Sequence, residues 1–186
     1  MKLLFIITLL AVSTNSLADS KRFDKQLENL SGKKAPLVAQ KFLDKGYEEL
    51  KIGKIDEAVK NWEEAIKHYE LFELYYFIIA DTYYNADRHL QACKYYLKTV
   101  NADPNNAQAR MRLGICEIRN KNWNKAITYF NESLELSPNQ ALAYYYIAAS
   151  YGVLKEHVKA KVNLQRALLI NPNLIIDDTS VLFKYL

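Results

Sequence analysis

The chain has 186 residues, a formal net charge of +4 and hydrophobic side chains at half of its positions. This length is within the range of one domain, and so small an excess of positive charge gives no reason to expect nucleic-acid binding. Lysines and acidic residues are interspersed along the chain, which is typical of solvated helix faces.

Residues 1–18 have the pattern of a cleavable export signal. Lys2 precedes an apolar run over residues 3–12, and Ala18 stands directly before a charged segment. The run is shorter than the ~20 apolar residues that a membrane-spanning helix needs. We therefore expect cleavage after Ala18, no stable membrane insertion afterwards, and export to the periplasm, with the extracellular space as the alternative.

Residues 19–38 predict an N-terminal leader or capping helix. Phe23, Leu27 and Leu30 have the spacing of one short amphipathic helix, and Gly32 ends it.

A 34-residue period organises the rest of the chain. It is carried by three series of equivalent positions: Ala58, Ala92, Ala126 and Ala160; Trp62, Tyr96, Phe130 and Leu164; Gly46, Ala80, Gly114 and Ala148. A fixed period of this length indicates stacked repeats, each of which buries its apolar face on its neighbours. The repeats span residues 39–72, 73–106, 107–140 and 141–174.

Each repeat is expected to hold two antiparallel helices joined by a tight turn. Gly53 suits the positive φ of that turn in the first repeat, and Asp87, Lys121 and Lys155 take its place in the others. Prolines separate the later repeats, since proline cannot continue a helix. The first repeat has Glu70 at the proline position, so an atypical junction is expected there.

Residues 175–186 predict a short C-terminal capping helix. Val181, Leu182 and Tyr185 fall in the phase of the first helix of a repeat, whereas Phe183 and Leu186 leave the outer face apolar. That apolar face has two interpretations, simple capping or contact with another subunit or partner.

The third repeat carries the clearest family pattern, in Leu113-Gly114, Trp123, Ala126, Phe130 and Pro138. The chain resembles the tetratricopeptide repeat family over residues 39–174. The resemblance implies an all-α fold, a right-handed superhelical solenoid of four helix-turn-helix repeats closed by the C-terminal capping helix.

No constellation for catalysis is found. His68, His89 and His157 are isolated, and no phosphate-binding glycine loop or nucleophile motif occurs. The sequence therefore predicts no enzyme, no cofactor and no metal site.

The family resemblance implies a concave groove lined by the first helix of each repeat. The residues at the groove positions are mostly aromatic or apolar, with two arginines: Tyr47, Leu74, Phe77, Ile78, Asp81, Tyr84, Gln108, Met111, Arg112, Ile115, Arg119, Tyr145 and Tyr146. An apolar peptide or helix with an acidic group near Arg112 or Arg119 suits this set. The alternative is that several of these aromatics pack on neighbouring helices instead.

Two functions follow as hypotheses. The first is a protein-binding adaptor or scaffold that holds a partner peptide or helix in this groove during envelope assembly or secretion. The second is a homo-oligomeric structural scaffold that associates through the groove or the C-terminal helix.

Cys93 and Cys116 also leave two alternatives, a disulfide or two buried thiols. An exported chain meets an oxidising compartment, but a bridge needs Cα atoms within ~7 Å.

Overall fold

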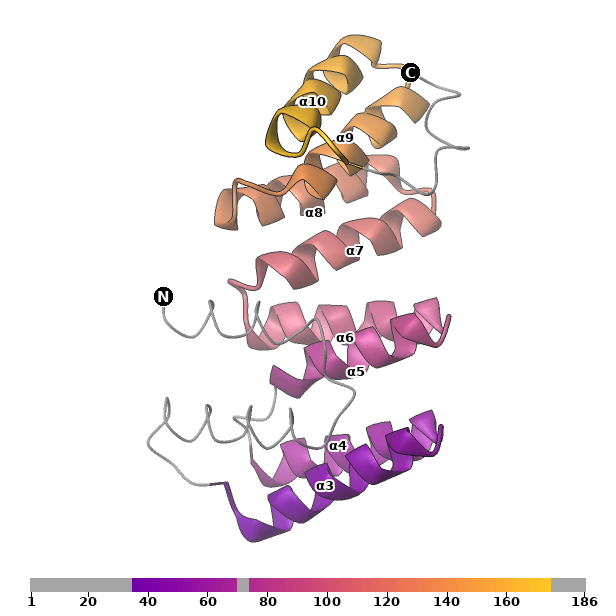
Figure 1. Ribbon diagram of the computed structural model, residues 1–186, viewed down its shortest axis with the longest axis vertical. Coiled ribbons are helices and arrows are strands. Elements are labelled where there is room, and N and C mark those ends of the chain that lie inside the picture. The colour runs from indigo at the N-terminus through magenta and orange to yellow at the C-terminus, as the bar shows by residue number, and fades with distance from the viewer. Residues whose placement is uncertain (1–34, 70–73, 175–186) are drawn as a thin grey trace. The chain divides into compact units, whose positions relative to one another are not determined.

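The computed structural model describes residues 35–69 and 74–174 (Figure 1). The predicted export signal, most of the N-terminal leader, the junction at Glu70 and the C-terminal capping helix lie outside the described residues. Within them the chain forms eight α-helices and no strand, which confirms the predicted all-α class.

The helices divide between two compact units, the first ending at Pro104 and the second beginning at Asn105. The first unit contains α3 (Leu37–Lys51), α4 (Ile55–His68), α5 (Tyr75–Asn85) and α6 (His89–Ala102). The second contains α7 (Ala107–Arg119), α8 (Trp123–Leu136), α9 (Ala141–Val153) and α10 (His157–Ile170). Consecutive helices pack as pairs, α3 with α4, α5 with α6, α7 with α8 and α9 with α10.

The turn inside each pair has the expected left-handed residue. Gly53 has a φ of 78°, and the equivalent Asp87, Lys121 and Lys155 have φ of 58°, 60° and 62°. A side chain other than glycine costs about 1–2 kcal/mol in this conformation. The fold therefore accepts local strain at three of its four turns.

The small residues of the 34-residue period lie where paired helices cross. A Cβ added to Gly46 would stand 2.4 Å from the Trp62 ring, and one added to Gly114 would stand 2.5 Å from the Phe130 ring. Both rings are fully buried, so they cannot move aside into solvent. The period thus reflects a steric requirement: a small residue on one helix accommodates a large aromatic ring on the other.

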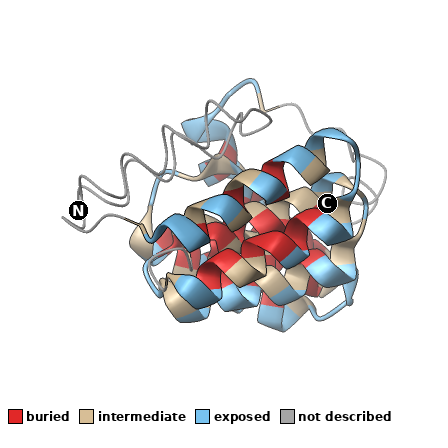
Figure 2. Ribbon diagram, turned by 90° about the horizontal axis from the view of Figure 1, so that it is seen from below, coloured by how far each residue is buried: buried red, intermediate tan, exposed pale blue. Residues whose placement is uncertain are grey.

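Each described helix has buried residues beside half-buried or exposed ones (Figure 2). In the first unit the largest fully buried side chains are Leu43, Trp62, Tyr75, Ile79 and Tyr96. Three of these are aromatic, and ring-to-ring contacts connect the two helix pairs: Tyr47 of α3 lies edge-on to Tyr75 of α5, with 6.4 Å between ring centroids.

In the second unit a single apolar cluster joins the two helix pairs. Ile127, Phe130 and Leu134 of α8 form it together with Ala143 and Ile147 of α9. This cluster makes α8 and α9 neighbours although they belong to different repeats.

The loop between α8 and α9 is held by a half-buried amide. The Gln140 side chain donates from Nε2 to the carbonyl oxygens of Ser133 at 3.0 Å and Ser137 at 2.8 Å. The hydroxyl of Ser133, which is fully buried, donates to the Ala107 carbonyl oxygen at 2.6 Å. Side chains thus add hydrogen bonds to backbone carbonyl oxygens here, including that of Ser133, which also accepts from the Ser137 N–H at 2.9 Å.

Candidate functional site

The predicted groove residues fall into both units, so each unit presents its own set. Three of the thirteen are almost completely buried, and for these the groove assignment is corrected: Tyr47 is 2% exposed, Phe77 3% and Tyr145 2%. Side chains buried this deeply contribute to packing. They cannot contact a binding partner unless the surface changes conformation. The alternative that part of the aromatic set is structural therefore holds for them.

In the first unit the buried pair packs against the second helices. Tyr47 lies edge-on to Trp62 with 5.2 Å between ring centroids, and Phe77 is tilted against Tyr96 at 5.8 Å. Asp81, another predicted groove residue, accepts a hydrogen bond of 2.5 Å from the Tyr96 hydroxyl. Its carboxylate is thus part of the internal structure of the α5–α6 pair.

The other predicted residues of the first unit remain partly exposed. Leu74 precedes α5, and Ile78 and Tyr84 lie on it, all three half-buried. The Tyr84 ring lies edge-on to His89 with 5.2 Å between centroids. This unit offers a smaller apolar surface than the sequence pattern indicated.

The second unit brings more of the predicted set together on one helix face. Gln108, Met111, Arg112, Ile115 and Arg119 are spaced three and four residues apart along α7, which places them on one side of that helix. Arg119 is exposed and the other four are half-buried. We call this set, with Tyr146 of α9, the α7–α9 surface.

Apolar members of this surface rest on the core of the unit. Met111, Ile115 and Tyr146 pack against the α8–α9 cluster while remaining partly exposed. The Tyr146 ring stacks on Phe130, with 5.5 Å between centroids and 12° between the ring planes. A rigid base of this kind holds the exposed parts of these side chains in place.

The charges of the α7–α9 surface are positive. Arg112 and Arg119 lie on it, whereas α9 contains no charged residue and has Leu142 42% exposed near its start. Glu117 is the one acidic residue on α7; burial raises its pKa, but hydrogen bonds from Lys125 and Asn122 hold that pKa below its usual range. The Glu117 carboxylate thus forms an ion pair with Lys125, with 2.6 Å between Oε1 and Nζ.

The structure reveals a polar network in the first unit that the sequence pattern did not indicate. Arg88, just before α6, donates from Nη1 to both carboxylate oxygens of Asp56 on α4, at 2.6 and 2.7 Å. The Tyr83 hydroxyl donates to the same carboxylate at 3.3 Å. Hydrogen bonding from Arg88 is the main cause that lowers the pKa of Asp56.

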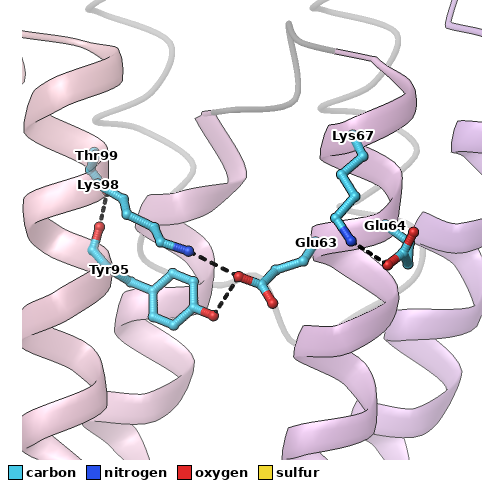
Figure 3. A network of polar contacts seen from close by, with 6 residues as sticks. All are labelled: Glu63, Glu64, Lys67, Tyr95, Lys98 and Thr99. Carbon is cyan, nitrogen blue, oxygen red and sulfur yellow. Dashed lines mark hydrogen bonds and ion pairs between the residues drawn. The ribbon is translucent and has the colours of Figure 1, made fainter.

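A second part of the network joins α4 to α6 (Figure 3). Glu63 accepts hydrogen bonds from the Tyr95 hydroxyl at 2.8 Å and from Lys98 Nζ at 2.9 Å. Burial raises the pKa of Glu63, but these two hydrogen bonds outweigh it and hold the pKa below its usual range. We call both parts together the α4–α6 clamp.

The clamp contains carboxylates, tyrosines and basic side chains, as catalytic sites often do, but its tyrosines are not poised to act as bases. Burial and the nearby Asp56 charge raise the pKa of Tyr83 to about 12, and burial together with Glu63 raises the pKa of Tyr95. Both tyrosines therefore stay protonated at neutral pH and act as donors, not as bases. The clamp is a structural link between two repeats.

The cysteines lie on one helix of each unit. Cys93 is half-buried on α6 and Cys116 is buried on α7, and neither is a free thiol. Because these helices belong to different units, the pairing of Cys93 with Cys116 stays a prediction, which the intact mass of the unreduced protein would test.

Residues 35–69 and 74–174 contain neither a candidate metal cluster nor a helix that could span a membrane. No group of three or more His, Cys, Asp or Glu side chains there is arranged to hold a metal ion. No helix in the same part of the chain combines the length and the apolar character that crossing a bilayer requires.

Comparison with known proteins agrees with this geometry. The sequence model of the tetratricopeptide repeat family matches residues 43–107 and 79–141, which together span more than half of the chain. The chain belongs to the tetratricopeptide repeat family.

Solved structures show the same fold at low sequence identity. A crystal structure of MamA protein is 22% identical with a TM-score of 0.66, over 74% of this chain and 75% of that one. MamA 41-end from Desulfovibrio magneticus RS-1 is 20% identical with a TM-score of 0.64, over 74% and 78%. A chain of the APC/C hetero-tetramer Cut9-Hcn1 is 21% identical with a TM-score of 0.57, over 74% of this chain and 28% of that one.

Proposed function

We propose that this protein is an exported, non-catalytic adaptor that binds a protein partner on the α7–α9 surface. The observation that carries the proposal is the combination on that surface of half-buried apolar side chains, held on a rigid core, with Arg112 and Arg119 and no charge on α9. Partly exposed apolar patches bordered by polar groups mark interaction sites.

The partner that fits is a peptide or helix with apolar side chains and an acidic group. Its apolar residues would meet Met111, Ile115 and Tyr146, and its carboxylate would meet Arg112 or Arg119 through charge-assisted hydrogen bonds. A protein of the tetratricopeptide family supplies such a surface from helices on a fixed scaffold. Envelope assembly or secretion is the setting that the sequence of residues 1–18 favours.

The test compares two charge reversals of equal size. Arg119→Glu places a negative charge on the proposed surface, and Lys121→Glu places one at the exposed turn beyond it. We expect cross-linking in native envelopes to capture a partner with the wild type and Lys121→Glu, and to lose that partner with Arg119→Glu, at unchanged melting temperature. Equal capture by both variants would contradict the assignment of the surface.

A second candidate function is a homo-oligomeric scaffold, and one observation favours it. Val158 is 80% exposed and Leu169 84% exposed on α10, an unusual exposure for large apolar side chains. Light scattering on the mature protein separates the two candidates, because a monomer at tens of micromolar is expected for the adaptor and a larger assembly for the scaffold.

A further inference from the structure

Helix α10 carries an apolar stripe on its outward side. Val158, Val162 and Leu169 have the spacing of residues that share one face of a helix, and their exposed fractions are 80%, 43% and 84%. Ala160 and Ala167 lie on the opposite face and are fully buried. The stripe is therefore separate from the face by which α10 packs in its pair with α9.

The outward side of the second helix is exposed in every described repeat. The residues that correspond to the stripe are all exposed: Asp56, Lys60 and Lys67 on α4; Leu90, Lys94 and Asn101 on α6; Asn124, Thr128 and Glu135 on α8. The exposure of the stripe thus belongs to its position in the repeat, since α8 shows it although another repeat follows. Among these four helices, α10 alone has an apolar side chain at all three positions, and apolar groups gathered on an exposed side indicate an interaction surface.

Basic side chains border the stripe. Helix α10 has no acidic residue and three basic ones: Lys159, Lys161 and Arg166. Lys161 is exposed and stands three residues after Val158, which places it beside the stripe. Glu156, just before the helix, is paired with Lys159 at 2.5 Å, so its charge is compensated. An apolar stripe bordered by lysine and arginine is typical of helices that lie on a membrane surface.

We propose that the outward side of α10 docks on a membrane surface that contains anionic lipids, with Val158, Val162 and Leu169 entering the headgroup region. The bordering basic side chains meet the lipid phosphates, and salt screens this attraction. A second copy of the chain is a poorer occupant, because two apposed α10 helices bring like charges together. The inference goes beyond partner binding on the α7–α9 surface and does not depend on it.

Binding of the mature chain to lipid vesicles, measured by co-sedimentation, tests the docking. Vesicles of phosphatidylglycerol and phosphatidylcholine in equal parts are compared with vesicles of phosphatidylcholine alone, at low and at high salt. The variant Val158→Asp is compared with Leu142→Asp as its matched control. Both are exposed apolar residues at the second position of their helices, where an acidic side chain is favourable. The two variants therefore add the same charge in matched places, and their melting temperatures verify that both are folded.

We expect the wild type and Leu142→Asp to bind the anionic vesicles about tenfold more tightly than the neutral ones at low salt, and to lose this preference at high salt. Val158→Asp should bind the anionic vesicles about tenfold more weakly than the wild type does. Equal binding by the two variants would overturn the proposal, as would equal binding of the wild type to both kinds of vesicle. A dimer in light scattering that Val158→Asp dissociates, without vesicle binding by the wild type, would also overturn it and would identify a second copy as the occupant.

Discussion

The two units use the same helix pairs but connect them by different chemistry. In the first unit α4 and α6 are linked through the ion pairs and hydrogen bonds of the α4–α6 clamp. In the second unit α8 and α9 are linked through the apolar cluster that contains Ile127, Phe130 and Leu134 and through the half-buried Gln140 amide. The first link is partly exposed and ionic, whereas the second is mostly buried and uncharged.

The clamp is absent from the second unit because its residues are absent. Two repeats after Asp56 and Arg88 stand Asn124 and Glu156, and two repeats after Glu63 and Tyr95 stand Asn131 and Asn163. Glu156 instead pairs with Lys159 within its own turn of helix, at 2.5 Å. The helix crossing is therefore the fixed element of the repeat, and the contact between second helices is free to vary.

The largest loss of stability is expected at the helix crossings, which have the same design in both units. Gly46→Ala and Gly114→Ala each place a Cβ within 2.5 Å of a buried ring, so each is expected to destabilise its unit by about 1–3 kcal/mol. Urea unfolding gives the total loss, and hydrogen exchange assigns it to a unit.

Gly53→Ala is the control for the loss of glycine itself. Nothing lies within 4 Å of its added Cβ, so only the positive φ costs free energy, about 1–2 kcal/mol, and no ring is displaced. Normal exchange of the amides around Trp62 in Gly46→Ala would contradict the steric account of the 34-residue period.

The next largest loss of stability is expected in the second unit only. Gln140→Leu removes the donor to the Ser133 and Ser137 carbonyl oxygens in the second unit. The Ser133 oxygen keeps its hydrogen bond from the Ser137 N–H, so we expect a loss of about 1 kcal/mol. Because the amide is uncharged, we expect the loss to be the same at pH 4 and pH 7 and at low and high salt. A loss that disappears in 1 M NaCl would show that charge, not the amide, holds the α8–α9 loop.

A smaller effect with a pH signature is expected at the clamp. The folded-state pKa of Glu63 is lowered, so its contribution is complete above the usual carboxyl pKa of about 4.3 and is lost as the pH falls through the folded-state value. Glu63 is about one third exposed, so Glu63→Gln should cost less than about 1 kcal/mol at pH 7, and nothing at pH 3 or in high salt.

Asn131→Gln is the matched control, since Asn131 holds the equivalent place in the second unit. Its urea midpoint should differ from that of the wild type by the same small amount at every pH. An equal pH dependence of the two variants would mean that the clamp does not act through the Glu63 charge.

The sequence predicts those parts of the molecule that depend on local geometry. The turn residues at Gly53, Asp87 and Lys121 were expected because a helix pair with so short a connection needs one residue with positive φ. The pairing of Gly114 with Phe130 was expected because a recurring small residue opposite a recurring aromatic one indicates a close crossing.

The candidate site was predicted less well, for a physical reason. Groove positions were inferred from the register of the family, which gives the direction of a side chain but not how deeply a large ring reaches into the core. Phe77 and Tyr145 hold the same repeat position as Leu43, which is fully buried, so this position points into the core in three of the four repeats. The sequence pattern did not indicate the clamp, because hydrogen-bonded partners such as Glu63 and Tyr95 are 32 residues apart. This separation differs from the 34-residue period, so the two residues do not hold equivalent positions of the repeat.

The smallest effect concerns the turns, where the first unit has Gly53 and Asp87 and the second has Lys121 and Lys155. Asp87 and Lys121 have nearly the same φ, 58° and 60°, but a short Asp side chain tolerates the left-handed region better than Lys does. Lys121→Gly should therefore stabilise the second unit by about 0.5 kcal/mol, after the entropy that glycine adds to the unfolded chain is subtracted from the strain released. Asp87→Gly should give less, or nothing, and Lys121→Ala should give no gain because alanine keeps the Cβ. Thermal unfolding of the three variants beside the wild type resolves this order, and a gain for Lys121→Ala would show that the lysine side chain, and not the backbone angle, is the source of the strain.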